Sequence, residues 1–261
     1  MSLDHDAGFV KRQTCSEDAF LGGRIIVSQP RAGFRAGMDS VLLGAAVAAD
    51  STSLCDLGAG AGTAALVALA QLEALTAVLV EIQLALAALA ASNIERNGFA
   101  RRARIIEADV AGPGAARHAA GLLADSFSSV IANPPFFAAG GGTPAPDGSR
   151  ATARHMPRDA LDNWLRAAAS LAAPDGEAIV IYPAAGLADL LSAFAPRFGA
   201  LTVLPLSPYP GADATRVLVR GRKGSRAPLR LLANRAVHVG PGGPRSEGIE
   251  SILRGNARLD W

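Results

Sequence analysis

The stretch Asp56-Leu57-Gly58-Ala59-Gly60-Ala61-Gly62-Thr63 decides the fold, because it joins a short apolar run to a longer helical one. The run before it, 53–57, has the length of a buried strand, and the segment after it, 63–71, favours a helix. Glycines at alternate positions let the chain turn tightly and bring backbone N–H groups against a ligand at the carboxyl end of a strand. The stretch therefore predicts a strand–turn–helix unit with a ligand crevice above it.

Short apolar runs and helical stretches alternate along the rest of the chain. Strand candidates lie at 53–57, 77–80, 103–106, 128–132, 178–181, 201–204 and 216–219, and helix candidates at 63–71, 82–96, 115–123, 158–172 and 187–195. Strands separated by helices form right-handed crossovers and a parallel sheet that is covered on both faces. No helix is apparent between the last two strands, which we expect to form an antiparallel edge pair. The predicted fold is α/β, with a doubly wound, mostly parallel, seven-stranded Rossmann-like sheet.

We expect one domain built from three segments. Residues 1–50 form an N-terminal extension that packs on the core, with a hairpin at Gly22-Gly23 and a helix over 38–49. Residues 51–225 form the α/β core. Residues 226–261 form a C-terminal segment of the same domain, and we expect its tail, 249–261, to be one short helix.

The composition indicates a globular protein with a large apolar core. Of the 261 residues, 50% are hydrophobic and 18% are charged, which excludes disordered and collagen-like chains. Two cysteines are too few for a disulfide scaffold or a cysteine zinc site, and we expect no metal. The acidic start lacks the apolar core of a secretory signal, and every apolar run is too short to span a bilayer. We therefore expect a cytoplasmic protein without a membrane partner.

Basic residues are concentrated late in the chain. The net charge of +2 does not by itself indicate a nucleic-acid partner. Residues 214–246, however, contain no acidic residue, and their basic residues are Arg216, Arg220, Arg222, Lys223, Arg226, Arg230, Arg235 and Arg245. Such a run is either a solvated face or a phosphate-binding surface.

Acidic residues follow the next two predicted strands. Glu81 ends the second strand, nineteen positions after Gly62 (81 − 62), where a carboxylate can accept hydrogen bonds from both ribose hydroxyls, and Ile82 comes next. Asp109 follows the third strand, where its side chain can reach an adenine amine. Because the carboxyl ends of parallel strands share one sheet edge, these residues predict a crevice for an adenosine ligand.

We expect this ligand to be S-adenosylmethionine instead of a dinucleotide. The dinucleotide motif requires glycine where Thr63 stands. A sulfonium cation with an amino-acid tail requires carboxylates nearby, and Asp39 and Asp56 are the candidates. The cofactor loop consists of Gly58, Ala59, Gly60 and Gly62. The pattern resembles motif I of class I S-adenosylmethionine-dependent methyltransferases.

The segment Asn133-Pro134-Pro135-Phe136 directly follows the fourth strand. Two consecutive prolines cannot donate to a β-ladder, so the strand must end there. The side-chain oxygen of Asn133 and the carbonyl of Pro134 can then accept both hydrogens of one amine, while Phe136 offers a flat face to a planar substrate. An amine held in this way directs its lone pair at a methyl donor and requires no strong general base.

This segment resembles the [N/D]PP[Y/F] motif IV of methyltransferases that act on adenine, guanine or glutamine nitrogen. Two flanking segments, 22–43 (GGRIIVSQPRAGFRAGMDSVLL) and 214–224 (ATRVLVRGRKG), resemble the entrance and penultimate edge segments of the bacterial tRNA1(Val) adenine N6-methyltransferase family. That family lies in the small-domain methyltransferase superfamily. Together these resemblances cover most of residues 18–225.

The resemblance implies methyl transfer from S-adenosylmethionine to the exocyclic amine of an adenine in structured RNA, above all tRNA, with S-adenosylhomocysteine as product. It also implies that Asp39 and the glycine loop hold the methionine part, Glu81 the ribose and Asp109 the adenine of the cofactor. Asn133 to Phe136 would hold the target base, with Asn133 also beside the cofactor. As RNA contacts we predict Phe137, Arg154, His155, Arg216, Arg220, Arg222 and Lys223.

Other readings of the same residues stay open. The acceptor could be a protein glutamine or another RNA, although glutamine enzymes usually carry a helical N-terminal domain and the chain before Asp56 is short for one. A small-molecule O-methyltransferase would leave the paired acceptors of Asn133 and Pro134 without a purpose. A non-catalytic cofactor-binding protein is disfavoured because every motif position needed for the chemistry is present.

Overall fold

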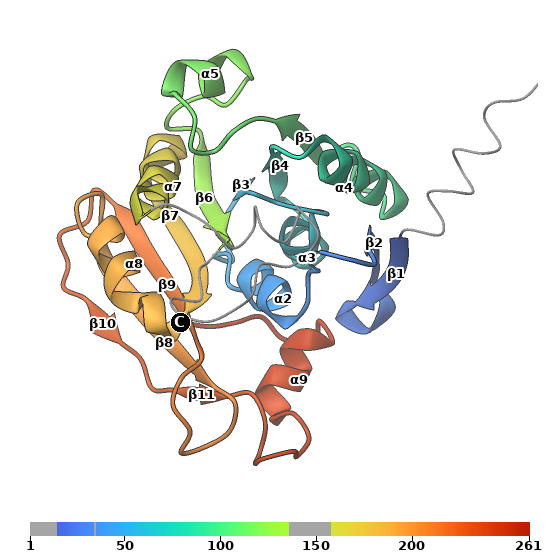
Figure 1. The fold of residues 1–261 in the computed structure, drawn as a ribbon, viewed down its shortest axis with the longest axis vertical. Coiled ribbons are helices and arrows are strands. Elements are labelled where there is room, and N and C mark those ends of the chain that lie inside the picture. Colours follow the sequence, from blue (N-terminus) through green and yellow to red (C-terminus); the bar gives the residue numbers. More distant parts are fainter. Residues whose placement is uncertain (1–14, 34, 136–157) are drawn as a thin grey trace, which may run out of the picture.

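A computed structural model describes residues 15–33, 35–135 and 158–261 (Figure 1). Its strands are β1 (Cys15–Phe20), β2 (Ile25–Pro30), β3 (Ser53–Leu57), β4 (Thr76–Glu81), β5 (Ala103–Glu107), β6 (Phe127–Ala132), β7 (Ala172–Pro183), β8 (Phe198–Ser207), β9 (Arg216–Lys223), β10 (Arg230–Leu231) and β11 (Arg235–Ala236). Its α-helices are α2 (Met38–Ala45), α3 (Thr63–Gln71), α4 (Leu84–Arg96), α5 (Gly114–Ala119), α7 (Arg158–Leu171), α8 (Leu187–Phe194) and α9 (Glu247–Leu253). Two short 3-10 helices are η1 (Leu21–Gly23) and η2 (Ala184–Gly186).

One large sheet organises the described residues. Its strand order is β10-β8-β9-β7-β6-β3-β4-β5, and β11 also pairs with β8. The pairs β3–β4, β4–β5, β3–β6 and β6–β7 are parallel, whereas β9 runs antiparallel to both β7 and β8. The doubly wound α/β fold with an antiparallel strand pair is therefore confirmed.

The sheet has nine strands instead of the predicted seven, and β8 is not its edge. The two additional strands, β10 and β11, contain two residues each and pair in parallel with β8. Two residues are too few to show an alternating apolar pattern, so nothing in the basic run distinguishes them from a loop.

Helices cover both faces of the sheet, as Figure 1 shows for α7 and α8 on one side and for α2 and α3 on the other. Apolar residues of α2, α3, α4 and α9 share one buried cluster, and those of α7 and α8 share a second. Neighbouring strand residues alternate between them, so Leu54 joins the first cluster and Cys55 the second. Strands buried on both faces are apolar throughout, which made them recognisable in the sequence.

The described part of the N-terminal extension begins with the predicted hairpin of β1 and β2, in which Phe20 pairs with Ile25. Asn93 of α4 and Asn97, which directly follows this helix, bind the other edge of β2. The side-chain amide of Asn93 both accepts from and donates to the backbone of Ser28, at 2.8 and 2.9 Å, and Asn97 does the same with Ile26 at 2.9 and 2.8 Å. These bonds fix the extension beside α4 and the carboxyl end of the sheet.

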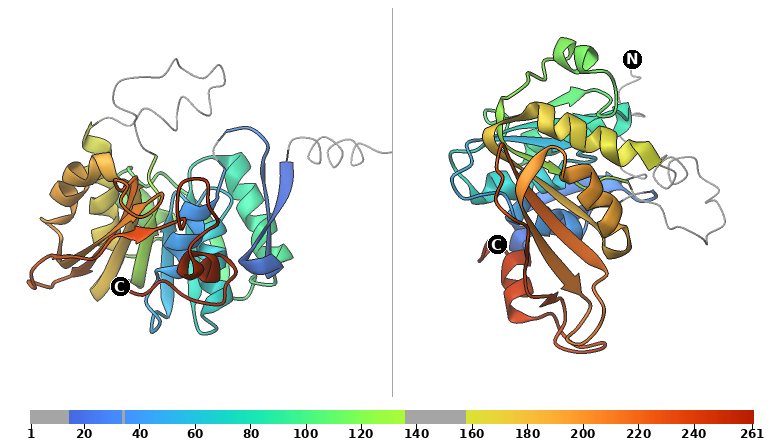
Figure 2. Two further views of the ribbon diagram at one scale, coloured as in Figure 1. Left: turned by 90° about the horizontal axis from the view of Figure 1, so that it is seen from below. Right: turned by 90° about the vertical axis from the view of Figure 1, so that its left-hand side faces the viewer.

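The C-terminal segment packs on the same core as the extension. Ile249 and Ile252 of α9 belong to the cluster that contains Leu42 of α2, and α9 lies against α2 in Figure 2. The predicted helix over 38–49 ends at Ala45, and in place of a helix over 249–261 the chain forms α9, which begins earlier, at Glu247, and ends at Leu253. The boundaries drawn at residues 50 and 225 stay a prediction. Among the described helices, none is both long and apolar enough to cross a membrane.

Candidate active site

Three strand ends meet at one point of the sheet. Leu57 of β3 pairs with Val80 of β4 on one side and with Ala132 of β6 on the other. The residues that follow, Gly58, Glu81 and Asn133, therefore leave the sheet as neighbours. Here the chain winds away from β3 in both directions, and such a switch in strand order is where doubly wound sheets bind ligands.

The glycine loop requires glycine for two different reasons. Gly58 has a φ of 65°, and a Cβ placed there would lie 2.4 Å from the ring of Trp164, which is buried. Gly60 also has a positive φ, 57°, but a Cβ there would meet nothing within 4 Å. The first glycine lets α7 pack against the loop, and the second leaves open space where a ligand can approach the backbone.

A cleft opens at these strand ends, and Asp56 lines it with only 2% of its surface exposed. Its Oδ2 accepts a hydrogen bond of 3.2 Å from the N–H of Ala65 in the first turn of α3. Burial raises the pKa of Asp56 to about 7, the Ala65 bond opposes this shift, and the nearby Glu81 carboxylate adds to it. Among the described residues Asp56 forms no ion pair, so this buried carboxylate facing a cleft is suited to a cationic ligand.

Glu81 holds the glycine loop in place. Its two oxygens accept the N–H groups of Gly60 at 2.9 Å and Gln83 at 2.8 Å, and the side chain is buried. Glu81 does not itself line this cleft. A carboxylate offers about four acceptor positions, so two remain on Glu81 for the ribose hydroxyls. Its predicted role as the ribose-binding residue is therefore chemically possible.

The remaining cofactor candidates lie along the same edge. Ile82 follows Glu81 with 61% of its surface exposed. Asp109 follows β5, is exposed, and accepts the N–H of Ala111 at 2.8 Å. Asp39, in the first turn of α2, accepts a hydrogen bond of 2.9 Å from Nε of Arg216. The structure thus brings together two residues that the sequence assigned to different ligands.

The predicted methyl-transfer segment is described only in part. Asn133 directly follows β6, is half-buried and lines the cleft together with Asp56, and Pro134 is buried behind it. Phe136 and Phe137 lie outside the described residues, as do Arg154 and His155. The placement of Asn133 beside the glycine loop follows from the pairing of β6 with β3.

The predicted RNA contacts on β9 all have partners within the protein. Lys223 binds the carboxylate of Asp125 at 2.5 Å, and Arg222 donates to the carbonyl of Asp175 at 3.0 Å. Arg220 lies 3.9 Å from the carboxylate of Glu177. Arg216 binds Asp39. The basic residues of β9 thus form contacts within the protein that the composition of the segment did not indicate. Their proposed contacts with RNA stay predictions.

Comparison with known proteins identifies the family. Residues 36–145 match the model of the methyltransferase small domain. A tRNA1(Val) (adenine(37)-N6)-methyltransferase of Erwinia tasmaniensis is 30% identical over 177 residues, which cover 67% of this chain and 69% of the relative. The chain belongs to the methyltransferase small-domain family. A relative of the same description from Shewanella halifaxensis is 33% identical over 159 residues, 60% of this chain, but only 61% of that relative is covered.

One solved structure matches this chain over nearly the whole length of that structure. The structure, described as a predicted O-methyltransferase from Agrobacterium tumefaciens, is 30% identical with a TM-score of 0.71. The match covers 85% of this chain and 98% of the other. The class I methyltransferase fold expected from the glycine loop and the Asn133 segment is thereby confirmed.

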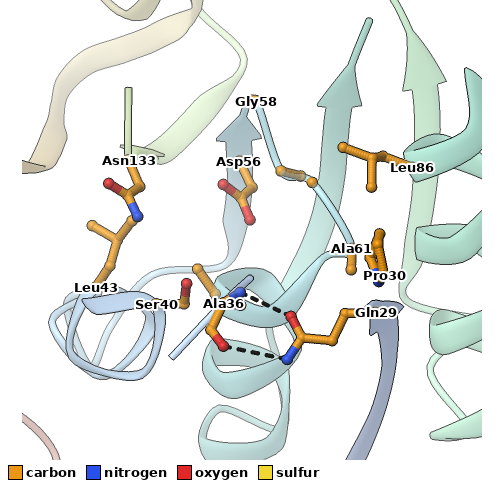
Figure 3. Close-up of a pocket in the computed structure, with 13 residues that line it drawn as sticks. Gln29, Pro30, Ala36, Ser40, Leu43, Asp56, Gly58, Ala61, Leu86 and Asn133 are labelled. Carbon is orange, nitrogen blue, oxygen red and sulfur yellow. Dashed lines mark hydrogen bonds between the residues drawn. The ribbon is translucent and has the colours of Figure 1, made fainter. Parts of the chain in front are cut away.

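In this member of the family, the N-terminal extension builds one wall of the cleft (Figure 3). The lining residues that the sequence did not identify are Gln29, Pro30, Ala36, Ser40, Leu43, Ala61, Ala64 and Leu86. Gln29 is buried, and its side-chain amide accepts the N–H of Ala36 at 2.8 Å and donates to the carbonyl of the same residue at 3.3 Å. Its Nε2 also donates to Asp18 at 2.7 Å. Gln29 lies in β2, next to the Pro/Gly-rich segment, and its side-chain partners carry no periodic signal, so these contacts could not be predicted.

Proposed function

We propose that this protein transfers a methyl group from S-adenosylmethionine to the exocyclic amine of an adenine in tRNA, giving N6-methyladenosine and S-adenosylhomocysteine. One observation carries the proposal: Asn133, at the end of β6, lines the same cleft as Asp56 and the glycine loop. A target amine at Asn133 would therefore be adjacent to a cofactor bound at Asp56 and the glycine loop.

The residues of the cleft fit this cofactor chemically. Asp56 offers a buried negative charge to a cation, Ser40 offers a hydroxyl, and Gly60 leaves the loop open to a ligand. When bound, the cofactor supplies an electrophilic methyl group on a sulfonium.

The chain's own residues orient the acceptor. The side-chain oxygen of Asn133 and the carbonyl of Pro134 would accept the two N–H groups of the amine, so that its lone pair leaves the plane of the base. Alignment and proximity then supply most of the rate, as in other in-line displacements. The methylated nitrogen is acidic and releases its proton to solvent, so no general base is required.

The relatives favour tRNA as the source of the adenine. Those from Erwinia and Shewanella are both described as tRNA1(Val) (adenine(37)-N6)-methyltransferases. The Agrobacterium structure carries an O-methyltransferase description, but a hydroxyl acceptor would use only one of the two acceptor groups at Asn133 and Pro134. A cytoplasmic location, where tRNA is modified, is part of the proposal.

The test is labelled methyl transfer from S-adenosylmethionine into unmodified tRNA1(Val) transcript, followed by nucleoside analysis. We expect label in N6-methyladenosine, and a matched transcript with guanine at position 37 shows whether that adenine is the target. Cofactor binding is measured separately by calorimetry. If the cofactor binds and no tRNA is labelled, the proposal is wrong and a protein glutamine or another RNA becomes the acceptor.

A further inference from the structure

A second cavity lies far from the methyl-transfer cleft, over β8, β9 and β10, whose places in the sheet Figure 1 shows. Its volume is about 210 Å³ and its lining residues are Glu177, Ala200, Thr202, Arg220, Arg222, Ala227, Pro228 and Arg230. Strand β9 starts near the cleft with Arg216 and reaches Arg222 six residues later. At about 3.4 Å per residue the cavity is roughly 20 Å from the cleft along the sheet.

Strand register brings three arginines to this cavity. Arg230 of β10 pairs with Thr202 of β8, which in turn pairs with Arg220 of β9. Paired residues project on the same face of a sheet, and Arg222, two positions beyond Arg220, projects on that face as well. The basic residues therefore form a cluster that their spacing in the sequence does not show.

Only part of this positive charge is neutralised inside the protein. Glu177 is buried and lies 3.9 Å from Arg220, while its other oxygen accepts the N–H of Ala48 at 2.9 Å and the hydroxyl of Ser129 at 2.7 Å. Three arginines and one glutamate leave a formal charge of +2 (3 − 1) at the cavity. Burial lowers the pKa of Arg220, and the charges of Arg222 and Arg230 lower it further.

Arg222 and Arg230 are the groups free to bind an anion. Nη1 of Arg222 donates one hydrogen bond to the backbone carbonyl of Asp175, which leaves the other N–H groups of this guanidinium for an anion. Within the part of the chain that the structure describes, the guanidinium of Arg230 forms neither a hydrogen bond nor an ion pair, and the residue is exposed. Guanidinium groups bind phosphate through two parallel N–H···O bonds, which makes this pair suited to a phosphate.

We infer that this cavity binds a backbone phosphate of the RNA substrate, at a nucleotide about 20 Å from the methylated base. The inference rests on the proposed function for the identity of the RNA. A cavity of about 210 Å³ is smaller than the roughly 300–1,000 Å³ of sites that enclose whole small molecules, which favours one phosphate with its sugar over a complete free nucleotide. Ala227 and Pro228 supply an apolar side for the sugar.

Binding of fluorescent unmodified tRNA1(Val) transcript tests the site without requiring methyl transfer. We expect Arg222→Gln and Arg230→Gln each to weaken binding about 10-fold, the loss expected for one charge-assisted bond. Each should also reduce the slope of log affinity against log salt by about 1. Arg226→Gln is the matched control, because Arg226 is exposed in the same basic run but does not line the cavity. S-adenosylmethionine affinity checks the folding of every variant.

Three results overturn the inference. If Arg226→Gln weakens tRNA binding as much as the cavity variants do, the effect is the general field of the basic run. If the cavity variants lose affinity for inorganic phosphate but bind tRNA as tightly as the wild type does, the ligand of the cavity is a free phosphate compound. If the wild type does not bind tRNA, both this inference and the proposed function are wrong. Cavity-dependent tRNA binding without N6-methyladenosine would contradict the proposed function alone.

Discussion

Two buried carboxylates at the cleft have separate tasks. Glu81 uses both oxygens to hold the backbone of the glycine loop. Asp56 has one hydrogen bond, from Ala65 at the start of α3, where the helix dipole favours negative charge. Its pKa nevertheless rises to about 7, because burial outweighs both effects. Asp56 is therefore the group through which pH acts on the cleft.

We predict that S-adenosylmethionine binds more tightly as the pH rises from about 6 to 8. In the ligand-free protein Asp56 is protonated below its pKa of about 7 and charged above it. A cationic ligand favours the charged form, so binding near neutral pH should release a proton. Calorimetry in buffers of different ionisation enthalpy measures both the affinity and the proton release.

The Asp56→Asn variant is the control for this prediction. It also tests how the titration of Asp56 changes the stability of the protein. A carboxyl group whose folded pKa is raised stabilises the protein below its unfolded pKa of about 3.9, and this contribution is lost as the pH rises through the folded pKa. Ligand-free wild type should therefore lose stability between about pH 4 and 7 relative to Asp56→Asn. Parallel pH profiles of unfolding and of cofactor affinity in the two proteins would show that Asp56 does not titrate as described.

Asn133→Ala separates acceptor binding from cofactor binding. We expect turnover with tRNA to fall at least about 100-fold, as when a positioned polar group is removed from other active sites. S-adenosylmethionine affinity should change little, because the glycine loop and Asp56 are intact. Asn133→Asp keeps a side-chain acceptor and should retain measurable turnover. An Asn133→Ala enzyme with near-normal turnover would rule out the proposed hold on the amine.

At the scale of elements, the contact between α2 and α3 depends on a helical glycine. A Cβ on Gly44 would lie 2.3 Å from the carbonyl oxygen of Ala64 and 2.8 Å from Cβ of Val67. Such distances require the two helices to separate. Because α2 carries Ser40 and Leu43, which line the cleft, this contact also sets the width of the cleft.

We predict that Gly44→Ala destabilises the protein by about 1–3 kcal/mol, the usual cost of overpacking. The gain in helix propensity, about 1 kcal/mol, acts in the opposite direction and is smaller. Gly248→Ala in α9 is the matched control, because a Cβ there meets nothing within 4 Å, and it should leave stability unchanged or raise it. Urea unfolding measures both, and equal stabilities would show that α2 and α3 can separate freely.

The central elements could be predicted from the sequence because their signals are local. The bounds of β3 and α3 agree with the predicted ranges, since an apolar run, a glycine loop and a helical stretch follow one another without interruption. The end of α2 could not be predicted. Its last carbonyls bind residues more than 200 positions away: Ala45 accepts the N–H of Leu259 at 3.1 Å, and Ala46 accepts Nε1 of Trp261 at 3.0 Å.

The candidate site also contains residues that could be predicted from the sequence and contacts that could not. Gly58, Glu81 and Asn133 stand at strand ends, so the sheet brings them together once the strands are recognised. The pairing of Asp39 with Arg216 and the contacts of Gln29 join segments that only the folded chain brings together. Side-chain partners of this kind carry no periodic signal in the sequence.

At the scale of the whole molecule, the residues after α9 connect the sheet to α2. Trp261 donates to Ala46, the guanidinium of Arg220 on β9 lies 4.7 Å from the centre of the Trp261 ring, and Arg258 donates to the carbonyl of Val47. One short stretch thus touches the helix that lines the cleft and the arginine that lines the second cavity. The two sites share a structural support although they lie at different places on the sheet.

Substitution of Trp261 tests this support. Trp261→Phe removes the N–H donor but keeps a ring for Arg220, and should cost about 1 kcal/mol, the usual value of one hydrogen bond. Trp261→Ala also removes the ring and its packing, and should cost about 2–3 kcal/mol, since a cation–π contact contributes about 0.5–2 kcal/mol. Urea unfolding should give this order, with weaker cofactor affinity in the alanine variant because α2 is less well fixed. Equal losses in the two variants would mean that the ring on Arg220 contributes nothing, and two variants as stable as the wild type would mean that this stretch does not support α2.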